Sequence, residues 1–165
     1  MDEWQSQVSE EHELLHARVD AMRAALGEET PEKKFKTLCE IARILGPDLE
    51  LHLKKEEEVL FPALRWLAGK KAEGLDAIQN QHGQLRESFQ RLATLLCQCG
   101  CAPAALAWNE IEERTRQFVR ILEEHEEKER LLVLEVLEIG LQPDALVRLA
   151  KEMQGIVWRF REEGL

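Results

Sequence analysis

The chain has 165 residues and a formal net charge of −10. A chain of this length can bury a hydrophobic core as one domain, without disulfides or an obligatory partner. Charged residues make up 33% of it and aromatic residues only 5%, which is typical of helices with an aliphatic core and disfavours a β-sandwich. The excess of acidic residues disfavours nucleic acids and membranes as partners and favours cations.

The sequence predicts a cytoplasmic protein. Its first four residues, from Met1 to Trp4, contain neither the basic nor the apolar stretch of a secretory signal. The longest uncharged stretch, 92–109, has too few large apolar residues for a transmembrane helix. The cysteines are spaced unlike a secreted disulfide framework, so we expect reduced thiols at Cys39, Cys97, Cys99 and Cys101.

Helix-breaking glycines and prolines divide the chain into five segments, and none of these favours a strand. The predicted helices span about 5–26, 32–68, 74–99, 104–139 and 144–163. Thr30 followed by Pro31 predicts an N-cap and a first helical position. Gly46-Pro47 falls inside the second helix, where we expect a kink or a local break shortly before His52.

The apolar stripes of the helices are interrupted by polar residues at matching positions. The first and third helices share one spacing, in Val8, His12, Leu15, Val19, Met22, Leu26 and in Ile78, His82, Leu85, Phe89, Leu92, Leu96. The second and fourth share another, in Leu45, Leu49, His52, Glu56, Val59, Ala63 and in Phe118, Leu122, His125, Glu129, Leu132, Val136. The sequence therefore predicts two related helical hairpins, offset by 70 residues from His12 to His82 and by 73 from His52 to His125.

Short connections make consecutive helices antiparallel, which predicts an up-down-up-down four-helix bundle with the stripes facing inward. The polar residues of the four stripes then meet in one interior layer. The fifth helix has an apolar side that we expect to pack on the bundle. If that side were exposed, it would serve as a docking or homodimer surface. Its residues are Leu146, Leu149, Ala150, Met153, Ile156, Val157 and Phe160.

Four imidazoles and two carboxylates in a core layer predict a metal site. A lone buried carboxylate costs several kcal/mol, so the layer needs a partner for its charges. Residues four apart project from one helix face, and nitrogen with carboxylate oxygen suits iron, manganese or zinc. If two metals share both glutamates and a solvent-derived bridge, each has five ligands. One position then stays open for O2, NO or peroxide.

These residues lie in motifs that resemble the hemerythrin-like (HHE cation-binding) domain. The motifs are Glu11-His12-Glu13-Leu14-Leu15, His52-Leu53-Lys54-Lys55-Glu56-Glu57-Glu58-Val59-Leu60-Phe61-Pro62, Gln81-His82-Gly83-Gln84-Leu85 and His125-Glu126-Glu127-Lys128-Glu129. The resemblance covers four of the five helices, so we expect the bundle over 1–140 and the additional helix over 141–165. It also implies a non-haem di-iron centre, bridged by two glutamates, with the ligands His12, His52, Glu56, His82, His125 and Glu129.

The sequence departs from the oxygen-carrying hemerythrins at the third helix. Those proteins have a His-x3-His pair there, whereas Ile78 and Arg86 occupy the positions four before and four after His82. His16 is a candidate for an additional ligand or for a residue beside the site. This departure favours metal binding over reversible O2 carriage.

Three functions remain open from the sequence. The first is a protein that binds or senses O2, NO or iron. The second is a di-iron enzyme that handles peroxide or NO, disfavoured because the chain has no tyrosine, a common proton donor. The third is a scaffold that holds zinc or a single metal ion.

Other polar and aromatic residues receive simpler interpretations. Cys97, Cys99 and Cys101 indicate either a plain loop or a thiol switch or soft-metal site. The four tryptophans are expected to be packing residues. The remaining glutamates of the motif helices are expected on solvated faces, namely Glu57, Glu58, Glu123, Glu124, Glu126 and Glu127.

Overall fold

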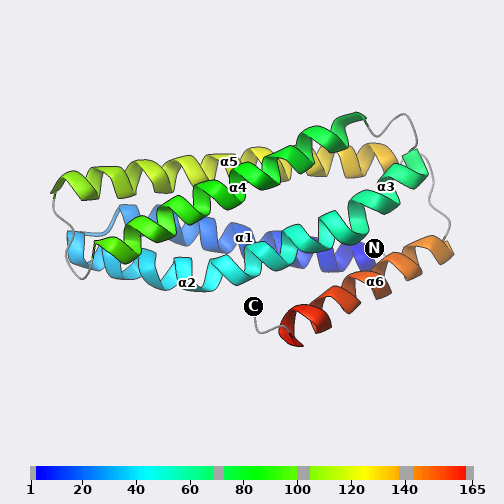
Figure 1. Cartoon of the computed structure of the whole chain (residues 1–165), viewed down its shortest axis with the longest axis horizontal. Coiled ribbons are helices and arrows are strands. Elements are labelled where there is room, and N and C mark those ends of the chain that lie inside the picture. The colour runs from blue at the N-terminus through cyan, green and yellow to red at the C-terminus, as the bar shows by residue number, and fades with distance from the viewer. Residues whose placement is uncertain (1–2, 69–72, 100–104, 138–142, 163–165) are drawn as a thin grey trace.

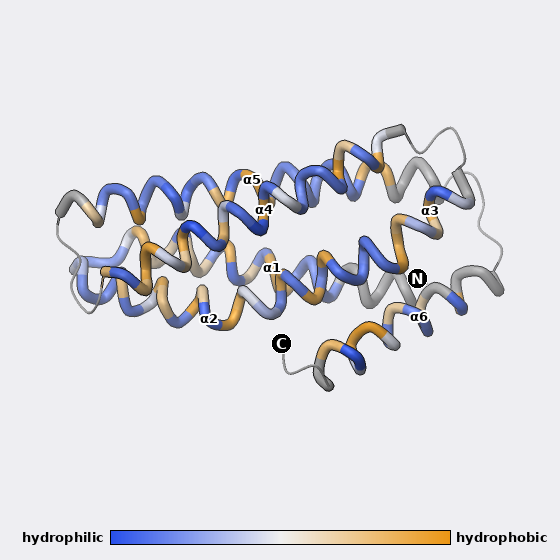
Figure 2. Tube along the Cα trace, in the orientation of Figure 1, coloured by the Kyte–Doolittle hydropathy of each residue, from blue (hydrophilic) through white to orange (hydrophobic). Residues whose placement is uncertain are grey.

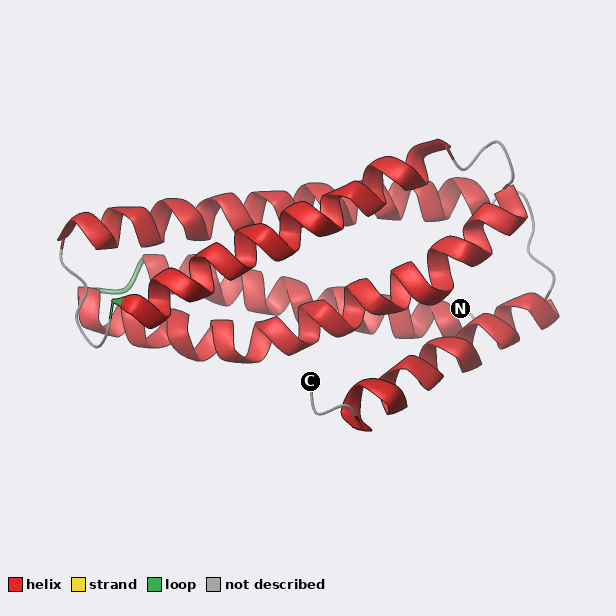
Figure 3. Ribbon diagram, viewed as in Figure 1, coloured by secondary structure: helices red, strands yellow, loops and turns green. Residues whose placement is uncertain are grey.

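The computed structural model describes residues 3–68, 73–99, 105–137 and 143–162, and within them it contains helices and no strand (Figures 1 and 3). This confirms the all-α prediction. The second predicted helix is interrupted by a π-helical turn, η1. In chain order the elements are α1 (Glu3–Leu26), α2 (Pro31–Lys55), η1 (Glu56–Leu60), α3 (Phe61–Ala68), α4 (Glu73–Gln98), α5 (Ala105–Leu137) and α6 (Pro143–Glu162).

Helix α2 begins as its sequence predicts. The Thr30 hydroxyl oxygen lies 3.3 Å from the backbone N–H of Lys33 and accepts its hydrogen bond, while Pro31 occupies the first turn. Of the kink or local break expected at Gly46-Pro47, the break is wrong, because α2 runs without interruption through Pro47. The kink stays a prediction. A Cβ on residue 46 would lie only 3.0 Å from Cε1 of Phe89. Gly46 thus allows α2 and α4 to approach closely, and buried leucines on both sides of Pro47 hold the helix together.

Four long helices form the predicted bundle. Helix α1 packs against α2 and α5, and α4 packs against the same two neighbours. Consecutive helices run in opposite directions (Figure 1), which is the up-down-up-down order. Orange and blue alternate along the helices in Figure 2, as expected of helices with one apolar face.

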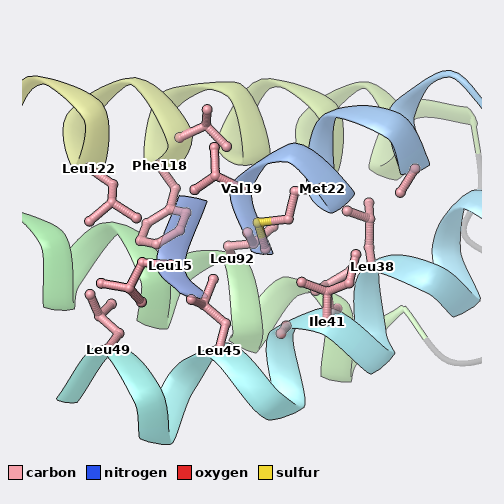
Figure 4. Close-up of a cluster of buried hydrophobic side chains, with 14 of the residues drawn as sticks. Leu15, Val19, Met22, Leu38, Ile41, Leu45, Leu49, Leu92, Phe118 and Leu122 are labelled. Atoms are coloured by element: carbon pink, nitrogen blue, oxygen red, sulfur yellow. The ribbon is translucent and has the colours of Figure 1, made fainter. Parts of the chain in front are cut away.

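The buried apolar side chains form two separate clusters. In the larger one, Leu15, Leu49, Phe118 and Leu122 point toward one another from three helices (Figure 4). The smaller one contains residues of η1, α3, α4, α5 and α6. On α5 the larger cluster ends at Leu122 and the smaller one contains Leu132. The pair His125 and Glu129 therefore lies between the two clusters.

Helix α6 lies against α1, α2 and η1. Its residues Ala150, Met153, Ile156 and Phe160 are buried. The side chains of Leu146 and Leu149 lie outside the described residues. No helix in the described ranges combines the length and hydropathy that crossing a membrane requires.

The expectation that the tryptophans pack in the core is only partly correct. Trp108 packs against the larger cluster and donates from Nε1 to Glu112. Trp66 and Trp158 are instead 79% and 68% exposed, because each lies on the side of its helix that faces away from the bundle. The side chain of Trp4 lies outside the described residues.

Candidate metal centre

Five elements bring the six predicted residues into one layer between the two apolar clusters. Helix α1 supplies His12, α2 supplies His52 and η1 supplies Glu56. Helix α4 supplies His82, and α5 supplies both His125 and Glu129. All are buried except His12, whose side chain is 18% exposed. The six polar residues predicted from the interrupted stripes therefore lie together in space.

The π-helical turn shapes one wall of this layer. It begins at Glu56, whose backbone N–H still bonds back to His52, and ends where the N–H of Phe61 bonds to the carbonyl of Glu56. One extra residue in this turn shifts the buried face, so that Leu64 rather than the predicted Ala63 continues the stripe. Phe61 consequently lies beside the His82 ring, with 5.2 Å between ring centroids.

One group of candidate ligands joins α1, α2, η1 and α5. His12 Nε2 lies 3.0 Å from Glu129 Oε2, and His52 Nε2 lies 3.1 Å from Glu56 Oε1. The two imidazole rings meet edge to face, with 4.9 Å between centroids. Potential ligand atoms of these four residues all lie within 4.8 Å of one another, so one cation could contact all four.

A second group lies on the other side of Glu56. His82 Nε2 is 2.9 Å and His125 Nε2 is 3.5 Å from Glu56 Oε2. Because Glu56 faces His52 with one oxygen and these two histidines with the other, it belongs to both groups. Glu129 belongs only to the first group among the described residues, so its predicted bridging role stays a prediction.

The inward atoms of the six residues lack hydrogen bonds although they are buried. They include Nε2 of all four histidines and both oxygens of Glu56 and of Glu129. Nitrogen and oxygen atoms approach within about 3 Å, but none of these contacts is a hydrogen bond. Buried polar groups in native proteins are almost always satisfied. Convergent unsatisfied imidazole nitrogens and carboxylate oxygens fit a divalent metal ion.

The electrostatics of the layer separate the two carboxylates. Burial favours the neutral acid, but the charge of His52 and the contacts with His125, His52 and His82 hold the pKa of Glu56 well below its usual value. Burial, followed by the negative charge of Glu56, raises the pKa of Glu129 to about 7. Near neutral pH Glu56 is thus ionised, whereas Glu129 would have to lose a proton before it could bind a cation.

Two histidines also carry partners on their outer nitrogens. Glu57 Oε1 lies 2.7 Å from His82 Nδ1, and Arg86 donates to the same carboxylate. Glu11 Oε2 lies 3.6 Å from His52 Nδ1, and the buried Lys55 donates to Glu11. No sequence pattern predicted Glu11 and Lys55 as neighbours of the site, because Lys55 lies in the charged run 54–58, which is typical of a solvated helix face.

The expectation of solvated faces is wrong for Glu126 and Glu57. Glu57 is half-buried, and Glu126 is only 5% exposed because it points into the contact between α5 and α1. There its Oε2 lies 3.2 Å from Nε2 of His16, whose side chain is 54% exposed. His16 is absent from both ligand groups found among the described residues.

The three cysteines among the described residues lie apart from this layer. Cys39 and Cys99 pack against the larger apolar cluster, and Cys97 is exposed. No potential metal cluster in the described part of the chain includes a cysteine. Cys101 lies outside the described residues, so the alternatives of a loop and a thiol site stay untested.

Comparison with known families agrees with this geometry. A family model described as the hemerythrin HHE cation binding domain matches residues 5–137, which include all six candidate ligands. Comparison with curated proteins and with solved structures gave no match.

Proposed function

The chain belongs to the hemerythrin HHE cation-binding family, and from that premise we propose that its polar layer binds two iron ions. The observation that carries the proposal is the convergence of buried nitrogen and oxygen atoms that have no hydrogen-bond partner. His12 and His52 would hold one ion with Glu129. His82 and His125 would hold the other, and Glu56 reaches both groups.

The donor set supports iron without excluding related metals. Imidazole and carboxylate ligands suit iron, manganese and zinc, and a di-iron centre is what resemblance to the hemerythrin-like family implies. Bound iron supplies a redox-active centre with a coordination position that a small ligand can occupy. We propose that the protein binds or senses O2, NO or iron, and that it does so in the cytoplasm.

The chain itself contributes order and exclusion of water to this site. Glu57 and Glu11 orient His82 and His52 from outside. Apolar side chains lie on both sides of the layer, which keeps the effective dielectric constant low and strengthens charge interactions inside it. Four apolar residues of α6, namely Ala150, Met153, Ile156 and Phe160, are already buried against the bundle, so we do not propose a homodimer through them.

Metal analysis is the direct test. Protein purified from iron-supplemented cells should contain about two irons per chain, one for each ligand group. Its near-ultraviolet and visible spectrum should change on exposure to air. One metal or none, with a spectrum indifferent to air, would contradict the di-iron proposal, and bound zinc would indicate the scaffold function instead.

A double variant tests the assignment of the carboxylates. Glu56→Ala combined with Glu129→Ala should abolish binding of two metals, because Glu56 is shared and Glu129 completes the first group. Glu58→Ala combined with Glu127→Ala is the matched control, since both side chains are exposed and lie on the same elements. Unchanged metal stoichiometry in the first double variant would refute the assignment.

A further inference from the structure

Helices α1 and α5 carry two successive pairs of a histidine and a glutamate. His12 faces Glu129 at 3.0 Å, and His16 faces Glu126 at 3.2 Å. His16 follows His12 by four residues and Glu126 precedes Glu129 by three, so the pairs lie about one helical turn, or 5.4 Å, apart along antiparallel helices. The second pair is therefore an outer copy of part of the candidate metal centre.

The Glu126 carboxylate lacks the partner that its burial requires. It is 5% exposed, and neither oxygen accepts a hydrogen bond. The contact with His16 is close but is not a hydrogen bond.

His16 connects this buried carboxylate with solvent. Its side chain is 54% exposed, whereas the inner pair is 18% exposed at His12 and fully buried at Glu129. A cation arriving at His16 would meet a nitrogen and a carboxylate oxygen, the same donor types as in the inner layer. Two protein ligands leave most of the coordination sphere to water, so such a site would hold an ion weakly and release it readily.

We propose that His16 and Glu126 form an outer divalent-cation site, one helical turn from the inner layer, at which ions are held before they enter it. The inference rests on the proposed function, since it needs an inner layer that binds cations. It assigns His16 and Glu126 to uptake, whereas the six inner residues determine how many ions stay bound.

Uptake kinetics of Co²⁺ test the proposal on the metal-free full-length chain. Rapid mixing with excess Co²⁺, followed by its visible absorption, gives the rate of filling, and metal analysis after desalting gives the number of ions retained. Glu126→Gln should slow filling about tenfold. Changing a residue outside the ligand shell typically lowers metal affinity or activity by about 10- to 100-fold, and we expect the smaller effect here. The number of ions retained and the final spectrum should equal those of the unmodified protein.

Glu127→Gln is the matched control, because it removes the same charge one residue further along α5 from an exposed side chain paired with Arg130. It should fill at the unmodified rate. His16→Ala should slow filling without endangering the fold, since the side chain is mostly exposed.

Each contrary result has a distinct meaning. Equal rates for Glu126→Gln and Glu127→Gln would overturn the outer site and leave the inner centre intact. Fewer retained ions in Glu126→Gln would also overturn it, because Glu126 would then be an inner ligand. An unmodified chain that retains no Co²⁺ would refute cation binding by the inner layer, and with it the proposed function.

Discussion

Glu57 Oε1 lies 2.7 Å from Nδ1 of His82, and Arg86 donates to both oxygens of that carboxylate. Arg86 also donates to Glu50 on α2, so it ties α4 to the segment that carries Glu56. Burial alone would raise the pKa of Glu57, but Arg86 and His82 lower it. A charged Glu57 accepts a hydrogen bond from the Nδ1–H of His82, which leaves Nε2 of that histidine free to face the polar layer.

Glu57→Gln should therefore weaken metal binding by the group that contains His82. Loss of such an outer partner typically lowers metal affinity by about 10- to 100-fold. Competition titration with a chelator measures the effect, and one of the two ions should be released at a lower chelator concentration. Glu58→Gln is the control, because Glu58 is exposed and accepts from Arg159 rather than from a histidine. Equal affinities in the two variants would show that the Glu57 contact does not support binding.

The metal-free chain should lose stability as the pH rises toward neutrality, because of Glu129. The pKa of this carboxyl is about 7 in the folded chain against an ordinary value of 4.5. Between these values the folded chain binds more protons than the unfolded chain, so the free energy of unfolding falls with rising pH. The contribution is complete below pH 4.5, is lost above pH 7, and amounts to about 3 kcal/mol.

Glu129→Gln cannot ionise and should lack this part of the pH dependence. Urea unfolding of both metal-free proteins at about pH 5 and pH 8 measures it. The variant should gain stability relative to the unmodified chain at the higher pH. If the two proteins differed in free energy of unfolding by the same amount at both pH values, the raised pKa would not belong to Glu129.

The fold and the six inner residues could be predicted because they depend on one regular property. Apolar residues recur with the α-helical period, and a histidine or glutamate in such a stripe must face the interior. His12 and His82 occupy the same position in two stripes of identical spacing. This repetition is stronger evidence for a metal site than any single histidine would be. The bundle then follows from short connections between antiparallel helices.

The features that escaped prediction depend on departures from this period or on neighbouring helices. The π-helical turn after Lys55 moves the buried stripe from Ala63 to Leu64. A prediction that assumes a regular α-helix throughout this segment cannot include that shift. Glu126 is adjacent to His125 and belongs to a run of acidic residues, which is typical of a solvated face. Glu126 is buried because α1 packs closely against α5 at this point. The sequence of α5 alone does not reveal that contact.

Single substitutions at the two carboxylates should separate their roles. Glu56 offers ligand atoms to both groups, whereas Glu129 offers them only to the first. Glu56→Gln should therefore reduce binding at both positions, and Glu129→Gln should leave one ion bound by His82, His125 and Glu56. Ions retained per chain after desalting distinguish these outcomes. Equal losses in the two variants would instead support bridging by both glutamates, as resemblance to the hemerythrin-like family implies.

Two glycines inside helices should respond oppositely to alanine. At Gly83 in α4 an added Cβ meets no atom within 4 Å, so Gly83→Ala should raise the free energy of unfolding by about 1 kcal/mol through helix propensity. At Gly46 the Cβ would lie 3.0 Å from Cε1 of Phe89, whose ring packs against Phe118. Displacing that ring should cancel the gain, so Gly46→Ala should give no increase in urea unfolding experiments. A stabilisation equal to that of Gly83→Ala would show that α2 and α4 are less closely packed at this point than the structure indicates.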